Sequence, residues 1–234
     1  MATVSSEQLG SPCGSGEPLH IVAHLKTGVV LTRPLMLDAL LAWAVANQER
    51  RLPPLPGEDS PTIEIPIQRS KCGRFHLCSQ GHAVRELSEV RHKNRRPPAM
   101  EYARLGSSKI RRVDISVGAN KSYRVPYELR LLEGDRIEWW CLGDADRILS
   151  LLSMVHYLGR HRGSGKGRLD LHGTPWTVEP CETWDGFPVV RDGEPLRQLP
   201  VDWDLPGGIK TFRNLTYPYW DKTREELLLC PSTM

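Results

Sequence analysis

The residues best suited to chemistry lie in one short segment in which glycines alternate with cations. Residues 158–169 read Leu-Gly-Arg-His-Arg-Gly-Ser-Gly-Lys-Gly-Arg-Leu. Glycine tolerates positive φ and the close approach of another chain, so successive backbone N–H groups can turn outward into a concave anion site. The side chains that would add charge there are Arg160, Arg162, Lys166 and Arg168. The segment therefore predicts a loop that binds phosphate.

The order of elements around this loop argues against a nucleoside triphosphatase. Before the loop, residues 144–158 carry apolar side chains at helical spacing after Asp144, a candidate N-cap. A nucleotide P-loop runs strand, loop, helix and needs Ser or Thr after its lysine, whereas Gly167 follows Lys166 here. A surface turn with solvated charges remains the alternative to phosphate binding.

A second group of cations lies upstream, in a chain whose overall charge is close to neutral. The 234 residues carry a formal net charge of +3, yet residues 69–130 hold fifteen Lys or Arg against five Asp or Glu. A basic block of this size in a nearly neutral chain indicates a polyanionic partner, with plain solvated surface as the alternative.

Within the basic block, residues 109–128 are interpreted as a β-hairpin. Two β-rich runs, Ile110–Val117 and Tyr123–Tyr127, flank residues 118–121, which suit a turn. Cations beside an aromatic ring on which a base can stack are typical of a grip on single-stranded nucleic acid. The binding residues predicted in the hairpin and in the glycine loop are Lys109, Arg111, Arg112, Asn120, Lys121, Ser122, Tyr123, Arg124, Arg160, His161, Arg162, Gly163, Ser164, Gly165, Lys166 and Arg168.

The other segments indicate both strands and helices. Runs rich in β-branched residues predict strands at Leu19–Leu25, Thr62–Gln68, Phe75–Ser79, Arg136–Leu142 and Leu169–Val178. Pro66 cannot donate to a ladder, so the second of these strands is expected at an edge or a bulge. Helical spacing predicts helices at Leu35–Gln48, opened by Pro34, and at Lys222–Leu229. The polar, basic residues 85–100 are interpreted as an arm.

This order of elements predicts an α+β fold of the ferredoxin-like βαββαβ type, the arrangement of RNA-recognition domains. The predicted organisation is a polar disordered tail at 1–18, a ferredoxin-like domain at 19–178 with the basic arm at about 85–128, and a Trp- and Pro-rich extension at 179–234 packed on the core. The tail lacks the features of a secretion signal, and the longest apolar stretch, Leu35–Val45, is short of the about 20 residues that span a bilayer. We therefore expect a cytoplasmic protein with reduced cysteines and no membrane partner.

Histidines and cysteines raise the questions of metal binding and catalysis. Cys72, His76, Cys78 and His82 fall within eleven residues. The two cysteines are separated by five residues, outside the zinc-site spacing of about two to four, so we expect no metal and no cofactor. His20 and His24 share one face of the first strand, where packing against a core is commoner than catalysis.

Several segments together resemble a known family. The helix, the GRHRGSGKGR loop and the following strand resemble the glycine-rich loop unit of the RAMP superfamily, the repeat-associated RNA-binding proteins of CRISPR systems. The blocks LHIVAHL, LMLDALLAWAV, DISVGANKSYRVPYE and RIEWWCLGD together resemble the Cas five-type subunit of type IV CRISPR effector complexes. The resemblance covers residues 19–219.

The resemblance implies a noncatalytic subunit with the RAMP fold that holds the 5′ handle of the guide RNA (crRNA) and caps one end of a ribonucleoprotein. Its implied partners are the repeated backbone subunit, which is Cas seven-type, and the large subunit. Target DNA would be recognised through pairing with the guide. The hairpin Lys109–Arg124 corresponds to the family's thumb, and the loop cations correspond to the family's glycine loop.

Two other functions stay open. Related RAMP proteins cleave repeat RNA, and the candidate acids and bases for such an endoribonuclease are His20, His24, His161 and His172. A general RNA-binding domain without a guide function would keep the basic hairpin and loop but would not need the Trp-rich extension for subunit contacts.

Overall fold

The structure, a computed structural model, describes residues 16–31, 33–50, 63–95, 123–160, 163, 165–183, 186–203, 205–217, 219 and 224–232, with the backbone alone described for 91–95 and 123–130. The elements in chain order are β1 (Glu17–His24), β2 (Val29–Leu31), α2 (Leu37–Gln48), β3 (His82–Arg95), β4 (Tyr123–Gly143), α4 (Ala145–Leu152), β5 (Trp176–Pro180), β6 (Val190–Arg191), β7 (Glu194–Pro195), β8 (Leu199–Pro200), the 3-10 helix η3 (Val201–Trp203), β9 (Gly208–Arg213) and β10 (Glu226–Pro231). In this part of the chain, no helix has the length and apolar character needed to cross a bilayer.

The long strand β4 organises the main sheet because it is paired along both of its edges. Ile137 of β4 pairs with Ala23 of β1 and with Ala83 of β3, while Leu131 pairs with β2 and also with β3. The strand β3 therefore occupies one edge of β4, and β1 and β2 follow one another along the other edge. With β5 added beside β1, every pairing in this sheet is antiparallel. The chain is α+β, as predicted, and this arrangement is compatible with a ferredoxin-like fold.

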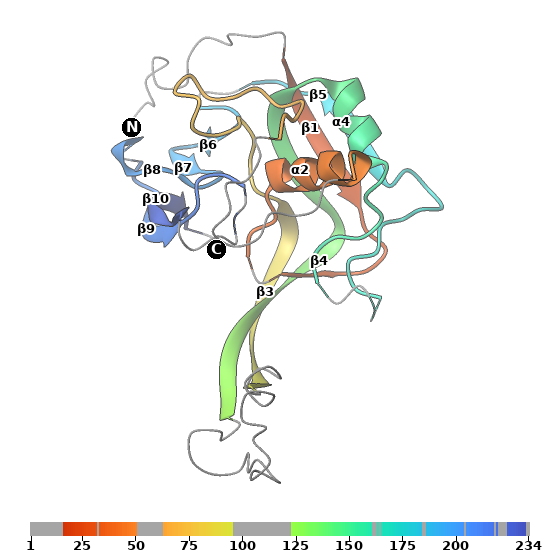
Figure 1. Ribbon diagram of the computed structural model, residues 1–234, viewed down its shortest axis with the longest axis vertical. Helices are drawn as coiled ribbons and strands as arrows, with labels where there is room; N and C mark the ends of the chain where they lie inside the picture. The colour runs from red at the N-terminus through yellow and green to blue at the C-terminus, as the bar shows by residue number, and fades with distance from the viewer. Residues whose placement is uncertain are drawn as a thin grey trace, which may run out of the picture.

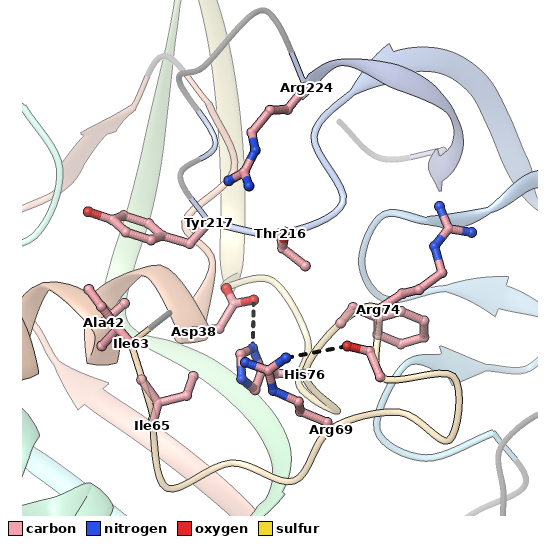
Figure 2. A pocket seen from close by; sticks show the side chains of 12 residues that line it. Asp38, Ala42, Ile63, Ile65, Arg69, Arg74, His76, Thr216, Tyr217 and Arg224 are labelled. Carbon is pink, nitrogen blue, oxygen red and sulfur yellow. Dashed lines mark hydrogen bonds and ion pairs between the residues drawn. The ribbon is translucent and has the colours of Figure 1, made fainter. Parts of the chain in front are cut away.

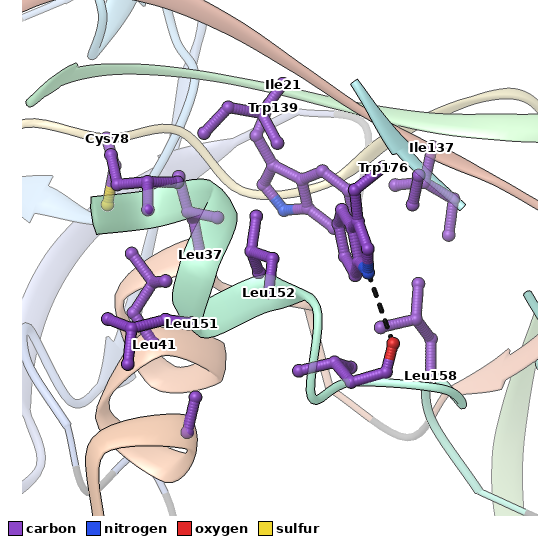
Figure 3. Packing of buried hydrophobic residues seen from close by; sticks show 14 of the residues in the cluster. Ile21, Leu37, Leu41, Cys78, Ile137, Trp139, Leu151, Leu152, Leu158 and Trp176 are labelled. Atoms are coloured by element: carbon purple, nitrogen blue, oxygen red, sulfur yellow. Dashed lines mark hydrogen bonds between the residues drawn. The ribbon is translucent and has the colours of Figure 1, made fainter. Parts of the chain in front are cut away.

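The helices α2 and α4 cover one face of this sheet, and the main core lies between the helices and the sheet (Figure 1). The strand β1 alternates as a half-buried strand should, since Leu19, Ile21 and Ala23 have no exposed surface and the residues between them are partly exposed. Two buried indoles fasten the layers, because Trp139 Nε1 donates to Leu35 O at 3.0 Å and Trp176 Nε1 donates to Val155 O at 3.1 Å. Figure 3 shows both rings packed against the leucines of the helices.

The helix before the glycine loop is shorter than the sequence predicts. Asp144 caps it as expected, since its Oδ1 accepts a hydrogen bond from Arg147 N at 3.0 Å. The helix ends at Leu152, and the chain turns at residues 153–154. The apolar residues beyond the turn, Val155 and Leu158, are 3% and 0% exposed, so they belong to the core without belonging to the helix. Their burial explains why the apolar stripe extends past the helix.

In the described residues, the basic arm consists of the paired strands β3 and β4. β3 and β4 stay in register from Arg85 opposite Glu133 to Arg95 opposite Tyr123, and Figure 1 shows both strands extending away from the helices. The segment Tyr123–Tyr127 therefore pairs with residues 91–95, and its pairing with Ile110–Val117 stays a prediction. Residues 110–117 lie outside the described residues. Residues 84–90 are all exposed, so no inward-facing stripe marks β3 as a strand in the sequence.

The C-terminal residues form a second sheet, in the order β8, β10, β9, over a second apolar cluster. This cluster joins Leu199, Leu228 and Leu229 to Phe75 and Leu77 from the segment that precedes β3. The helix predicted at Lys222–Leu229 is wrong, because Glu226–Pro231 form β10. Leu228, Leu229 and Cys230 are all buried, and burial between two neighbouring strands overrides the helix preference of a Glu- and Leu-rich run.

Three other predicted strands also differ from the observed ones. In the described residues, the segment Thr62–Gln68 makes one isolated bridge, Ile67 with Gly143, and the segment Phe75–Ser79 makes isolated bridges at His76 and Cys78; neither forms a continuous strand. Pro66 lacks a backbone donor, which disfavours a continuous ladder there. The strand predicted at Leu169–Val178 begins at Trp176, and residues 171–173 form a turn.

Candidate nucleic-acid interface

The glycine loop is fixed at both ends by the turn between β1 and β2. Leu158 N donates to Gly167 O at 2.8 Å, and Gly167 N donates to Gly28 O at 2.9 Å. Lys26 N donates to Arg168 O at 2.8 Å, and Arg160 N donates to Val30 O at 2.8 Å. The loop therefore projects from a rigid base made by backbone hydrogen bonds, a suitable support for a binding site.

The glycines of the loop fall into two groups. A Cβ on Gly167, where φ is +68°, would lie 1.9 Å from Leu158 O, and a Cβ on Gly159, where φ is +69°, would lie 2.5 Å from Val30 O. These two glycines are required by the fold of the loop itself. A Cβ on Gly163 or Gly165 would meet nothing within 4 Å among the described residues. The glycines at the exposed part of the loop thus leave space for a ligand.

Thr27 holds the exposed part of the loop in place, and the sequence alone does not single it out. Its Oγ1 donates to Gly165 O at 2.8 Å and accepts from Arg168 N at 3.0 Å. Lys26 beside it is exposed and adds a cation to the surface of the loop. The only local signal is a Lys-Thr-Gly turn after a strand, which is too common to identify a partner 138 residues away.

The predicted loop cations differ in their surroundings. Arg160 and Lys166 are exposed, whereas Arg168 is partly buried. The Nε of Arg168 is buried and has no hydrogen-bond partner among the described residues. Buried donors are usually satisfied, so this side chain is available to an acceptor. His161, Arg162 and Ser164 lie outside the described residues.

Strand β2 lies between the glycine loop and the part of β4 around Leu131, which is called the root of the arm. Val30 pairs with Leu131 of β4 and also bridges Arg160 of the loop. Neighbouring strands are about 4.8 Å apart, so the loop lies about 10 Å from β4 at this point. One strand therefore separates the loop from the root of the arm.

The predicted arm residues that the structure describes lie farther away. Tyr123 and Arg124 pair with Arg95 and Asn94. Tyr123 lies eight residues before Leu131 on β4. At about 3.3 Å per residue, Tyr123 is about 26 Å from the root of the arm. The predicted residues that lie outside the described ones are Lys109, Arg111, Arg112, Asn120, Lys121 and Ser122.

Two of the candidate catalytic histidines, His20 and His24, lie on the sheet face that the helices leave uncovered. His20 Nε2 lies 3.3 Å from Glu138 Oε2, and its ring stacks on Trp140 with 5.3 Å between centroids. His24 Nε2 lies 2.8 Å from Thr177 Oγ1. Each ring therefore has a polar partner, and neither packs in the main core. His172 is exposed in the turn before β5, and His161 lies outside the described residues.

The four residues considered for zinc point to different surroundings. Cys72 is exposed, whereas Cys78 is buried opposite Cys141, and burial raises the pKa of the Cys78 thiol to about 12. His76 lies near Asp38, and His82 packs against Trp140. Within the described ranges, no three His, Cys, Asp or Glu side chains are grouped as a metal site.

Comparison with known proteins assigns the family. The family described as CRISPR type IV associated protein Csf3 matches residues 82–231. The match begins at β3 and ends at β10, so it includes the arm, the glycine loop and the second sheet. No curated protein matched the chain. The chain belongs to the Csf3 family of type IV CRISPR-associated proteins, whose members are the Cas five-type subunit.

Proposed function

We propose that this protein is a noncatalytic crRNA-binding subunit of a type IV CRISPR effector complex, that it holds the 5′ handle of the guide, and that it caps the ribonucleoprotein. The observation that carries the proposal is the glycine loop, braced on the turn at residues 25–28 and separated from the root of a long β-ribbon by one strand. Under this proposal, the main domain is a RAMP fold with βαββαβ order, to which β2 adds a strand.

The chemistry of the loop suits an RNA backbone. Lys26, Arg160 and Lys166 are exposed cations around a loop whose outer glycines leave room for phosphate. Cations on such a surface release counterions from single-stranded RNA and provide affinity without reading sequence. The arm would then lie along the RNA strand beyond the loop. There Tyr123, a predicted binding residue, can stack on a base, and the neighbouring cations can contact phosphates.

The remaining parts of the proposal concern partners and place. Family membership supports a role within a multisubunit CRISPR complex. We propose the Cas seven-type backbone subunit and the large subunit as neighbours, and target DNA as a partner reached through guide pairing. Such an assembly would act in the cytoplasm.

The glycine loop gives a direct test. Replacing Gly163 and Gly165 together with valine is expected to abolish copurification of guide RNA with the effector complex, because the added side chains fill the space of the phosphate. The fold should survive with a cost of about 1–2 kcal/mol for the left-handed conformation at Gly165, where φ is +74°. Copurified RNA is measured on a gel and sequenced, and the melting temperature reports the fold.

Gly167→Ala is the matched control for stability. Its Cβ would meet Leu158 O, so this single variant should lower the melting temperature more than the double valine variant does. Guide RNA bound at the wild-type level by the double valine variant would remove the loop from the interface. Copurified RNA of mixed length and sequence would instead indicate a general RNA-binding domain.

A second candidate function is metal-independent cleavage of repeat RNA. The observation that favours it is the His20–Glu138 pair at 3.3 Å, with Trp140 stacked on the histidine and Arg136 bound to the same carboxylate at 2.6 Å. A histidine oriented by a carboxylate is a candidate general acid or base, and such catalysis contributes about 10²–10⁴ in rate.

Incubation with repeat RNA separates the two functions. We expect the wild-type protein to leave a CRISPR repeat RNA uncut at neutral pH, and we expect no change in cleavage for His20→Ala, His24→Ala or His161→Ala. Only His161→Ala, inside the loop, should weaken RNA binding, and only modestly. Specific cutting without metal that disappears in one of these variants would establish the endoribonuclease instead.

A further inference from the structure

A cavity of about 200 Å³ lies between α2, the segment at 63–76 and the C-terminal residues Thr216, Tyr217 and Arg224. Figure 2 shows Arg224 facing the cavity from one side and Arg69 facing it from the other, with Asp38 and His76 between them. No described residue of the glycine loop lines this cavity. The cavity is therefore a second candidate site, built from other elements.

The charge of this cavity favours an anion. Its one lining carboxylate among the described residues, Asp38, is 1% exposed and already has partners, because Tyr219 Oη donates to it at 2.7 Å and Arg197 Nη2 lies 3.5 Å from it. Arg74 is turned toward Glu226, with 2.6 Å between them. The guanidinium of Arg224 has no acidic partner among the described residues, and that of Arg69 contacts the carbonyl of Gly73 at 3.5 Å. Two arginines thus remain for a ligand.

The wall and floor of the cavity supply apolar surface and one polar ring. Ile63, Ile65 and Tyr217 form part of the wall. The ring of His76 lies at the floor, where burial, opposed by the nearby Asp38, lowers its pKa to about 4. The imidazole is therefore neutral at pH 7 and offers one donor and one acceptor. A flat heterocycle with polar edges matches this combination.

The size of the cavity limits the ligand. At about 200 Å³ the cavity is smaller than the about 300–1,000 Å³ of pockets that hold drug-sized ligands, and it is open to solvent on one side. It therefore suits one small ring system, with the attached phosphate lying outside at the arginine rim.

We propose that this cavity takes a single nucleotide of bound RNA, with the base beside Tyr217 and the two isoleucines and the phosphate between Arg69 and Arg224. Arginine recognises phosphate through paired N–H donors, which suits these two guanidinium groups. The inference rests on the proposed RNA-binding function and adds a base-holding site to it. The cavity would hold one nucleotide that is turned out of the RNA strand, while the loop and the arm bind the rest of that strand.

Titration with nucleoside monophosphates tests the site on the full chain. We expect the four ribonucleoside 5′-monophosphates to bind the wild-type protein, and we expect Arg69→Ala and Arg224→Ala each to weaken that binding at least tenfold. Tyr217→Ala should weaken the monophosphates while leaving inorganic phosphate unchanged. Arg147→Ala, which removes an exposed arginine of α4, is the matched control and should bind as the wild type does.

The comparison with the glycine loop separates the two proposals. The Gly163→Val and Gly165→Val double variant should lose long RNA and still bind monophosphates as the wild type does. Wild-type protein that binds RNA but no monophosphate would overturn the cavity proposal and leave the proposed function standing. Inorganic phosphate that binds as tightly as the monophosphates, or an acidic peptide that displaces them from the cavity while RNA does not, would also overturn it.

Discussion

Replacing Arg197 by methionine is expected to lower the free energy of unfolding by about 3–5 kcal/mol. Arg197 and Asp38 are 0% and 1% exposed, and the variant would leave the carboxylate buried without its cation. The same guanidinium donates to Tyr219 Oη at 3.2 Å and to Leu215 O at 2.8 Å, and it also donates to His76 O. Chemical denaturation of the purified chain measures the decrease.

Two controls show whether burial causes this effect. Arg74→Met breaks an exposed pair with Glu226, in which the side chains are 46% and 42% exposed, and should cost less than about 1 kcal/mol. Removing the buried network together, as Arg197→Met with Asp38→Leu and Tyr219→Phe, should recover much of the stability because no charge is then stranded. Equal decreases for Arg197→Met and Arg74→Met would contradict the assignment of a buried network.

The second large effect concerns affinity for single-stranded RNA. Changing Arg111, Arg112, Lys121 and Arg124 to alanine should flatten the plot of log affinity against log salt by about 2.8, at about 0.7 for each phosphate that these cations neutralise. If the wild type and the variant bind equally at about 1 M salt, this difference in slope makes the variant bind RNA about 10²–10³ more weakly than the wild type at about 0.1 M salt. Fluorescence anisotropy over a range of salt concentrations measures both quantities.

The matched variant removes four exposed cations from other surfaces. Lys71, Arg147, Lys210 and Arg213 are exposed and lie outside the arm and the glycine loop. Their replacement by alanine should leave the slope unchanged. A slope that falls equally in both variants would mean that the arm cations act as general surface charge, with no specific contact to phosphate.

The sequence predicts those elements of the fold that have one buried face. The alternation in β1 and the cap at Asp144 are local patterns, and both are confirmed. The arm has no buried face along residues 84–90, so its pairing could not be read from hydrophobic periodicity. The strand β10 is predicted as a helix because Glu225 to Leu229 favour a helix locally, while the burial that makes them a strand comes from β8 and β9.

The candidate sites divide in the same way. The glycine loop can be recognised because its glycines and cations are adjacent in the sequence. The role of Thr27 cannot be recognised from the sequence, because its contact with Gly165 spans 138 residues. The buried network beside the cavity cannot be recognised either, because Tyr219 and Asp38 are 181 residues apart. A buried arginine in a Pro-rich segment carries no local mark of its partner.

The pairing of β1 also determines when this protein can fold during its synthesis. His20 lies beside Glu138, which is 118 residues later, and His24 lies beside Thr177, which is 153 residues later. A ribosome adds about 5–20 residues per second, so the apolar side of β1 waits several seconds for β4 and longer for β5. Such distant pairing makes folding slow. An N-terminal fragment that ends before residue 136 lacks every β4 residue with which β1 pairs.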